Sequence, residues 1–266
     1  MFREWDAMPS QFDAAAFQRA LTTREIGRFL VYRTTVETTM TIARREADEG
    51  APHGTLVLAE EQTQGRGRRG RSFASPAGEN LYFTLVLRLT ADTHRRLPLI
   101  VPLAACEAVR AEGLDALIKW PNDIWVGARK LSGMLIDAEF RDDGFVAFPG
   151  IGINVNGDPT VVPELRDTAT SVRRELGRPI EREGLLARIC NNLESAFALE
   201  PAEVAGRYRA MSLVLGRSIT VSAVGADPFE ATAEGVDDDG SLRVRRVGGT
   251  VETVLAADVS VRPAGV

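Results

Sequence analysis

Seven consecutive residues combine a pliable backbone with dense positive charge: Gly65–Arg71 reads Gly-Arg-Gly-Arg-Arg-Gly-Arg. Glycine lets a backbone approach a ligand closely, and arginine forms charge-assisted, bidentate hydrogen bonds to phosphate. The segment also satisfies Gly-x-Gly-x-x-Gly, the fingerprint of dinucleotide-binding folds, but that fingerprint needs a helix directly after it. Here Ser-Phe-Ala-Ser-Pro follows, and then a predicted strand. The sequence therefore indicates an anion-binding loop outside a dinucleotide-binding fold.

Two kinds of ligand remain for this loop, a nucleic-acid backbone or a small molecule that carries phosphate. Proteins that bind single strands interleave aromatic side chains for base stacking, and the first aromatic residue after Gly65 is Phe73. The formal net charge of −5 also makes the surface as a whole repel nucleic acid. Both observations favour a loop that closes on one small, phosphate-bearing molecule, and we expect it to become ordered only with that ligand.

A second group of polar residues is predicted at one edge of a sheet. Lys119-Trp-Pro-Asn-Asp123 covers a strand end and a turn, and Lys130 comes eleven residues after Lys119. Because Gly127-Ala128 forms a hairpin between them, we expect both lysines to lie beside Asp123. Gly150-Ile-Gly-Ile-Asn154 adds a glycine-rich strand, which a ligand can approach closely.

These motifs are set in a pattern of elements that predicts an α+β fold, with a mainly antiparallel mixed sheet and flanking helices. Leu81–Leu89 alternates cleanly, so we expect one face of that strand to be buried. From residue 216 on, short strands and turns predict a small β-barrel. Helices are predicted at 10–21, capped by Ser10, and at 41–49, 98–112, 169–176, 182–199 and 203–210. Strands are predicted at 28–32, 55–61, 81–89, 117–120, 124–126, 131–140, 145–155, 218–224, 229–236, 242–247 and 251–255.

Composition narrows the class of protein. The chain of 266 residues is 44% hydrophobic and 26% charged, as in ordinary globular proteins. It shows no secretory signal and no apolar run of the ~18 residues that a membrane span needs. Cys106 and Cys190 lie in apolar helical stretches, which is typical of buried thiols in a reducing compartment. We therefore expect a cytoplasmic protein with no membrane partner.

Taken in order, the loop at 65–71, the Lys119–Asp123 turn, Lys130 and the strand at 150–154 resemble the biotin–protein ligases. The motifs span Thr34–Asn156, and the predicted architecture extends the resemblance over the whole chain. The resemblance implies a class II synthetase-like catalytic domain over residues 1–212 and an SH3-like domain over residues 213–266. It also implies an enzyme that joins biotin to ATP as biotinyl-5′-AMP and passes the biotin to a lysine of a biotin carboxyl carrier domain of an acyl-CoA carboxylase.

The same resemblance assigns site residues, with biotin and ATP as substrates and Mg²⁺ as cofactor. Asp123 is either the Mg²⁺ ligand or an aid to the acceptor lysine. Met40 stands where the family has Asn, and Phe73 stands where other members often have Trp. Contacts to biotin and biotinyl-AMP are assigned to Thr38, Thr39, Gln62, Gly65, Arg66, Gly67, Arg68, Trp120, Lys130 and Gly133. Nucleotide contacts are assigned to Arg71, Phe73, Lys119, Asn122 and Asn154, and catalytic roles to Arg68, Lys130 and Asp123.

Three alternatives differ from this expectation. Lipoate and octanoate transferases share the fold but lack the arginine-rich loop and carry a Gly-rich segment followed by His-Asp, which this sequence does not have. Ligases that also repress transcription have a winged helix of ~60 residues, whereas 37 residues precede Thr38 here, so we expect the single-function type and no DNA partner. A nucleic-acid-binding protein conflicts with the acidic charge. We expect the C-terminal domain to serve ATP handling or carrier docking.

Overall fold

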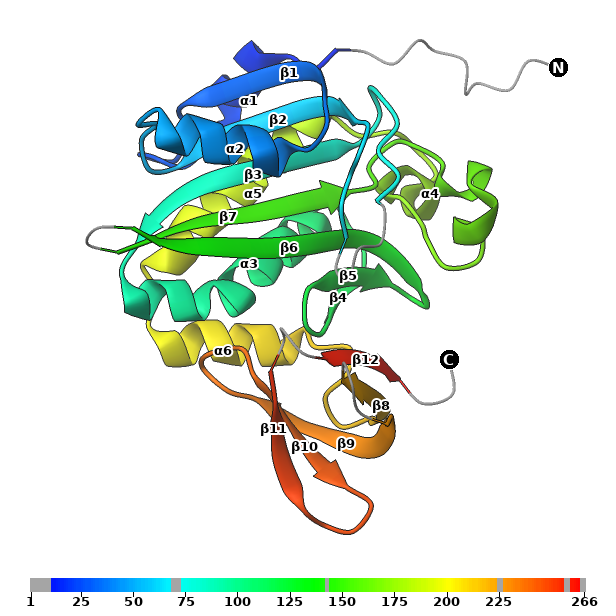
Figure 1. The fold of residues 1–266 in the computed structure, drawn as a ribbon. Helices are drawn as coiled ribbons and strands as arrows, with labels where there is room; N and C mark the ends of the chain where they lie inside the picture. The colour runs from blue at the N-terminus through cyan, green and yellow to red at the C-terminus, as the bar shows by residue number, and fades with distance from the viewer. Residues whose placement is uncertain (1–10, 68–72, 142–143, 224–226, 256–258, 264–266) are drawn as a thin grey trace, which may run out of the picture.

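A seven-stranded mixed sheet forms the centre of the larger part of the protein (Figure 1). The computed structural model describes residues 11–67, 73–141, 144–223, 227–255 and 259–263. Strands lie in the order β1-β2-β3-β7-β6-β5-β4; β1 and β2 are parallel, and the other neighbours are antiparallel. This confirms the predicted α+β class. The strands are β1 (Leu30–Val36), β2 (Thr55–Gln62), β3 (Leu81–Leu89), β4 (Ala116–Lys119), β5 (Asp123–Val126), β6 (Arg129–Arg141) and β7 (Gly144–Ile153).

Behind the sheet in Figure 1, a layer of helices buries its main apolar face. The layer holds α1 (Ala14–Ala20), α3 (Ala91–Ala111) and α5 (Arg182–Phe197). Below the sheet in Figure 1, α6 (Pro201–Ala210) packs on α3 and lies next to the C-terminal sheet. The predicted start of α3 at Pro98 is wrong by seven residues, because Thr90 caps the helix and Pro98 and Pro102 lie inside it. The predicted cap of α1 is also wrong: Asp13 accepts hydrogen bonds from the backbone of Ala15 and Ala16.

A single helix, α2 (Thr39–Asp48), covers part of the opposite sheet face, in front in Figure 1. Its buried residues Ala43 and Ala47 share a small core with Val86 of β3 and Phe148 of β7. The first seven residues of β3 are therefore buried on both faces, which differs from the one buried face that its alternation predicts. Because α2 is short, it leaves part of this sheet face, over β6 and β7, uncovered. A site can form there.

After the sheet, two 3-10 turns and α4 (Val172–Leu176) lead into α5.

The C-terminal part forms a separate five-stranded antiparallel sheet in the order β11-β10-β9-β8-β12, where a small β-barrel was predicted. Its last strand was not predicted from the sequence. The strands are β8 (Ser218–Ala223), β9 (Phe229–Val236), β10 (Leu242–Arg246), β11 (Val251–Val254) and β12 (Val259–Pro263).

Among the described residues, none of the helices has the length and apolar character that crossing a membrane would require.

Candidate functional site

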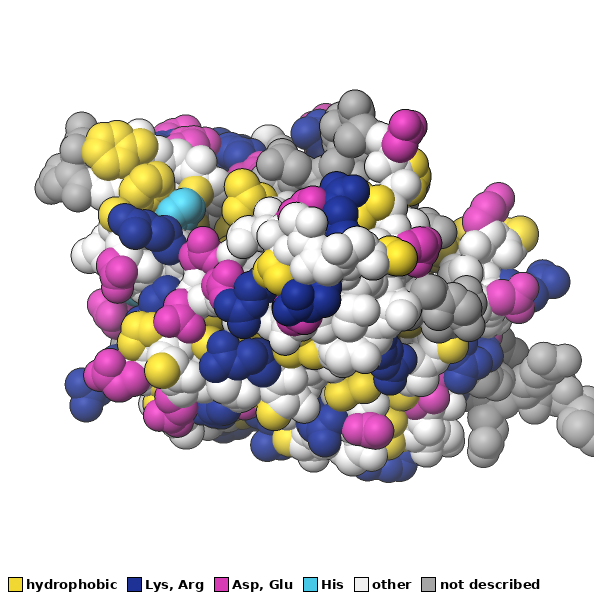
Figure 2. Space-filling model, turned by 90° about the horizontal axis from the view of Figure 1, so that it is seen from below, with side chains coloured by type: hydrophobic (Ala, Val, Ile, Leu, Met, Phe, Trp, Pro, Cys, Tyr) yellow, Lys and Arg dark blue, Asp and Glu magenta, His cyan; other side chains and the backbone are white. Residues whose placement is uncertain are grey.

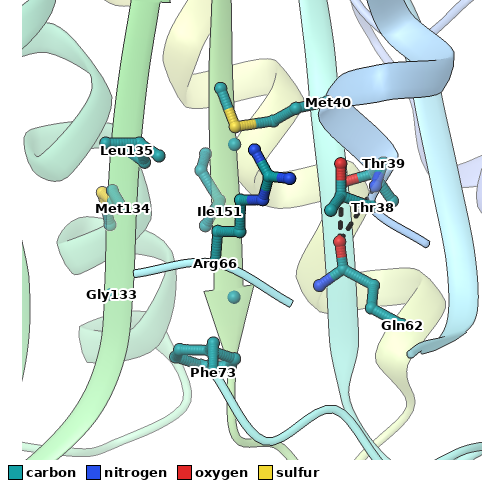
Figure 3. A pocket seen from close by; sticks show the side chains of 12 residues that line it. Thr38, Thr39, Met40, Gln62, Arg66, Phe73, Gly133, Met134, Leu135 and Ile151 are labelled. Carbon is teal, nitrogen blue, oxygen red and sulfur yellow. Dashed lines mark hydrogen bonds between the residues drawn. The ribbon is translucent and has the colours of Figure 1, made fainter. Parts of the chain in front are cut away.

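A cleft lies on the open part of the sheet face, beside the N-terminus of α2 (Figure 3). It contains about 430 Å³ of empty space, part of it continuous with solvent. Four segments that are far apart in the sequence meet here. They include Arg66 of the arginine-rich loop and Gly150 and Gly152 of the glycine-rich strand, whereas the Lys119–Asp123 turn does not line the cleft. The cleft is lined by Thr38, Thr39, Met40, Gln62, Arg66, Phe73, Gly133, Met134, Leu135, Gly150, Ile151 and Gly152.

Threonine and glutamine side chains form one polar end of the cleft. Thr38 caps α2, and its hydroxyl accepts a hydrogen bond from the backbone of Thr41. The Gln62 Oε1 atom accepts from Thr39 N at 2.9 Å and from Thr39 Oγ1 at 3.2 Å. Gln62 Nε2 donates to Ser75 Oγ at 3.2 Å. These bonds fix the orientation of the amide, and no other described residue accepts from its second N–H, which can donate to a ligand.

Three glycines lining the cleft leave it open because they have no side chains. A Cβ atom on Gly152 would come within 2.6 Å of Phe73 Cε1, and one on Gly150 within 3.1 Å of Met40 Cγ. At Gly133 the added atom would meet Lys130 Nζ at 2.9 Å. Side chains in these places would fill the space beside Phe73 and Met40, so the glycine-rich strand predicted from the sequence is a requirement of shape.

Lys130 brings a positive charge to the Gly133 end of the cleft. Its ammonium group donates to Asp123 Oδ1 at 2.7 Å, and about a third of the lysine side chain stays exposed. Its backbone is held on both sides, because Lys130 N donates to Thr168 O and Thr170 N donates to Lys130 O. The lysine is thus fixed in place but still open to a ligand.

Lys119 and Lys130 both lie close to Asp123, as the hairpin predicted, but they have different surroundings. Lys119 pairs with Asp123 in the β4–β5 ladder. Its side chain is only 8% exposed, and its ammonium group lies 3.7 Å from the centre of the Trp125 ring. A cation over an aromatic face is favourably placed, so the geometry makes Lys130 the more accessible of the two charges.

Arg66 extends across the cleft between Ile151 and Thr39 (Figure 3). It is exposed, and no hydrogen bond or ion pair joins it to another described residue, so its charge is available to an anion. Gly65 must be glycine, because a Cβ there would meet Phe73 O at 2.5 Å. Gly67 directly follows the arginine. Arg68 and Arg71, predicted as ligand contacts, lie outside the described residues, as does most of the loop whose ordering was predicted.

Trp120 is placed away from the cleft, and its assignment as a biotin contact needs correction. The side chain is 2% exposed and belongs to the main core. Its indole Nε1 donates to Gly240 O of the C-terminal sheet at 2.8 Å. Its charged neighbours in the sequence suggested a place at the site, but a large apolar ring at a strand end is buried first.

Two predicted nucleotide contacts also use their side chains within the protein. The Asn122 amide donates to Met134 O and closes the turn onto β6. The Asn154 amide donates to Thr170 O at 2.9 Å and ties the end of β7 to the segment before α4. Neither residue lines the cleft, but Asn122 is bonded to Met134, which does.

The part of the chain that the structure describes holds no cluster of ligating side chains for a metal ion. Among the described ranges, no group of three His, Cys, Asp or Glu side chains could hold an ion. Asp123 is engaged by Lys130 at 2.7 Å, so it fits better as the counter-ion of that lysine. Mg²⁺ commonly takes one or two carboxylates together with substrate phosphates.

Sequence reasoning missed several residues that line the cleft or hold its lining residues in place. Thr84 shares a hydrogen bond with Thr39 at 2.8 Å, and a threonine within the apolar run of Leu81–Leu89 was a signal for it. Ser75 holds the Gln62 amide. Leu135 and Ile151 form apolar walls, but nothing in the sequence separates them from ordinary core residues.

Comparisons with known proteins agree with this geometry. The model of the biotin/lipoate A/B protein ligase family matches residues 31–154, and that of the biotin protein ligase C terminal domain matches residues 214–262. The chain is 30% identical to the bifunctional ligase/repressor BirA of Bacillus subtilis, over 94% of this chain and 79% of that protein. It is 32% identical to the biotin–[acetyl-CoA-carboxylase] ligase of Paracoccus denitrificans, over 79% of this chain and 91% of that protein.

Solved structures give the same result. The biotin protein ligase from Aquifex aeolicus in complex with biotin and ATP has a TM-score of 0.75 and 26% identity, over 89% of this chain and 100% of that one. The biotin protein ligase from Leishmania major in complex with biotinyl-5-AMP has a TM-score of 0.60 and 28% identity, over 86% of this chain and 99% of that one.

Proposed function

The chain belongs to the biotin/lipoate A/B protein ligase family, and we infer that it is a biotin protein ligase. The observation that carries the proposal is that four segments far apart in the sequence line one cleft, and that the Lys130 ammonium group lies at its Gly133 end. Relatives and structures named for biotin, ATP and biotinyl-AMP support the choice of substrates.

The reaction has two steps. A carboxylate oxygen of biotin attacks the α-phosphorus of ATP, and the bond to the β-phosphate oxygen breaks, which gives biotinyl-5′-AMP and pyrophosphate. The uncharged amine of an acceptor lysine then attacks the acyl carbon, AMP leaves, and an amide forms. An ordinary lysine titrates near ~10.4, so its amine must lose a proton before or during this second step.

The polar end and the charged end of the cleft have different tasks in this proposal. Thr38, Thr39 and Gln62 hydrogen-bond the polar head group of biotin, and Met40 and Ile151 pack against its apolar part. Lys130 then lies where the carboxylate meets the α-phosphate. Two anionic groups must approach each other there, and a fixed positive charge stabilises the arrangement in the transition state.

Arg66 provides a second positive charge on the same reaction. It is exposed above Ile151, and no described residue neutralises it (Figure 3). We propose that Gly65–Gly67 lie over the adenylate, with Arg68 and Arg71 as further contacts. A mixed anhydride hydrolyses when water reaches it, so a loop over the cleft protects the intermediate. Phe73, Lys119, Asn122 and Asn154 stay proposed as the border of the nucleotide site.

The proposed protein partner is a biotin carboxyl carrier domain of an acyl-CoA carboxylase. The printed name of the Paracoccus relative supports this class of acceptor. Because ATP and such carboxylases occur in the cytoplasm, we place the reaction there. We also propose that residues 1–212 form the catalytic domain and residues 213–266 the C-terminal domain, in keeping with the C-terminal family match at 214–262.

Pyrophosphate release tests the first step. The purified chain with ATP should release pyrophosphate only when biotin is added, and labelled biotin should then appear on a carrier domain that has its acceptor lysine. A carrier with that lysine changed to arginine is the matched control and should stay unlabelled. The same assay is repeated with octanoate and with lipoate in place of biotin. Pyrophosphate release with either of these acids but not with biotin would identify a lipoate-type ligase and refute the proposal.

A further inference from the structure

We propose that the C-terminal sheet positions the Lys130–Asp123 pair through Trp120, which makes Trp120 a positioning residue for adenylate formation. The inference rests on the proposed function, because it concerns the same reaction. It replaces the biotin contact that the sequence suggested for Trp120 with a role that follows from where the ring lies.

The acceptor of the indole N–H is held firmly. Trp120 Nε1 donates to Gly240 O at 2.8 Å across the boundary between the two sheets. Gly240 has a φ of +84°, and a Cβ there would come within 2.8 Å of Pro98 Cβ in α3. Its own N–H donates to Asp237 O, and Asp237 N donates to Ser241 O. The carbonyl is thus fixed by its turn and by α3.

The turn after Trp120 leads directly to the charged pair. Asn122 exchanges hydrogen bonds with Met134 on β6, through its backbone oxygen and through its amide. The next residue, Asp123, accepts from Lys130 Nζ at 2.7 Å. Only Pro121 and Asn122 separate the anchored indole from the carboxylate, so a displacement at Trp120 passes to Asp123 with little to absorb it.

The hairpin has few ladder bonds of its own with which to resist such a displacement. β4 and β5 contain four residues each, and β4 lies at the edge of the sheet. Its outer side is covered by the segment that leads to the C-terminal sheet: Ile118 N donates to Met211 O, and Leu213 N donates to Ile118 O, both at 2.8 Å. The hairpin is therefore held at its edge and at its end by chain that belongs to or adjoins the C-terminal sheet.

Trp120→Phe in the full chain tests the inference, since it keeps an aromatic ring and removes the N–H. Single-turnover formation of biotinyl-AMP at saturating biotin and ATP should slow about tenfold or more, because misplacement by ~1 Å can cost up to about a hundredfold. The dissociation constant for biotin should stay within about twofold of the wild type, because Thr38, Thr39 and Gln62 are not disturbed.

Two further variants separate positioning from stability. Gly240→Ala should slow adenylate formation in the same way, because its new methyl group pushes the acceptor carbonyl away from Pro98. It also serves if Trp120→Phe does not fold. Arg209→Ala is the matched control: Arg209 Nη1 donates to Val236 O at 3.0 Å, another bond between the two parts. Its loss should lower the melting temperature slightly and leave the rate unchanged.

The inference is overturned if folded Trp120→Phe and Gly240→Ala form biotinyl-AMP at the wild-type rate and differ only in a lower melting temperature. Trp120 would then have a purely structural role. An equal loss of biotin affinity and rate would overturn it as well, because the whole site would then be disturbed. Failure of the proposed function looks different, since the wild type itself would then form no adenylate.

Discussion

The ring of Phe73 lies directly on the backbone of Gly152, so that a Cβ atom at residue 152 would come within 2.6 Å of Phe73 Cε1. The Phe73 ring also packs edge-on against the buried Tyr82, the partner of Gly152 in the β3–β7 ladder, with the ring centres 6.3 Å apart. The Tyr82 hydroxyl in turn accepts from Asn80 Nδ2 and donates to Pro76 O. The wall of the cleft at Phe73 therefore depends on the absence of a side chain at residue 152.

Gly152→Ala should weaken biotin binding about tenfold, because the added methyl group displaces the Phe73 ring into the cleft. Overpacking of this kind costs about 1–3 kcal/mol. Isothermal titration calorimetry with biotin measures the change. Gly206→Ala is the matched control, because a Cβ on this residue of α6 meets nothing within 4 Å. It should leave the affinity unchanged and raise stability by up to about 1 kcal/mol. Unchanged affinity in Gly152→Ala would contradict the fit of Phe73 to the glycine.

Lys130→Ala should slow adenylate formation by about a hundredfold or more, the range seen when one preorganised charge or donor is removed from a transition state. The melting temperature should change little, because a partly exposed ion pair contributes only about 0–1 kcal/mol. Arg207→Ala removes an ion pair of similar exposure, with Glu107, far along the chain from the cleft, and serves as the control. Equal turnover of Lys130→Ala and wild type would remove Lys130 from the reaction.

The sequence was informative about the site wherever residue type and spacing alone carry the chemistry. The hairpin predicts that Lys130 lies beside Asp123. The missing side chains of the glycines predict an open strand, and both features can be recognised in the sequence. Trp120 shows the limit. Its motif places it among charged residues, but its direction depends on a core completed by Gly240, 120 residues later in the chain. No local pattern contains that information.

The fold, too, has features that local sequence predicts and features that only tertiary packing decides. The alternation of Leu81–Leu89 predicts the strand, but tertiary packing of α2 decides that its second face is buried too. The start of α3 was missed because Pro98 normally marks a first turn, whereas the Thr90 cap and the long apolar face carry the helix past two prolines. Local preference is a weak guide where packing overrides it.

DNA binding by this chain should be weak and non-specific. The net charge is −5, and on the face in Figure 2 basic side chains are interspersed with acidic ones. That face offers no continuous track for phosphates. Electrophoretic mobility shifts with a biotin-operon duplex, with and without biotin and ATP, provide the measurement, and a random duplex of equal length is the control. A sequence-specific shift that survives ~150 mM salt would refute this prediction, since purely electrostatic binding weakens steeply with salt.

The last prediction concerns the buried ion pair of Glu60 and Arg182, which are 6% and 4% exposed. Arg182 Nη1 donates to Glu60 Oε2 at 2.8 Å, and the other carboxylate oxygen accepts from Tyr32 OH and from Phe12 N at 2.7 Å each. Burial acts to raise the pKa of Glu60, but these hydrogen bonds and the nearby guanidinium outweigh it and leave the pKa below its ordinary value. Burial and the bond to Glu60 raise the pKa of Tyr32 to about 12.

Glu60→Gln should therefore lower the free energy of unfolding by about 3–5 kcal/mol at pH 7, because it removes the carboxylate charge that stabilises the buried Arg182 guanidinium. A lowered pKa in the folded state gives stability that is present above the unfolded pKa of about 4.3 and is lost as pH falls through the folded pKa. The difference in unfolding free energy between wild type and Glu60→Gln should thus shrink by up to about 1.4 kcal/mol for each pH unit below about 4.3.

Urea unfolding from pH 7 down to about pH 3.5 measures this gap in unfolding free energy. Glu234→Gln, which disturbs the more exposed pair with Arg245, is the control and should cost at most about 1 kcal/mol. A gap that stays constant over this range would mean that Glu60 keeps an ordinary pKa, and the assigned hydrogen bonds would not stabilise its charged form.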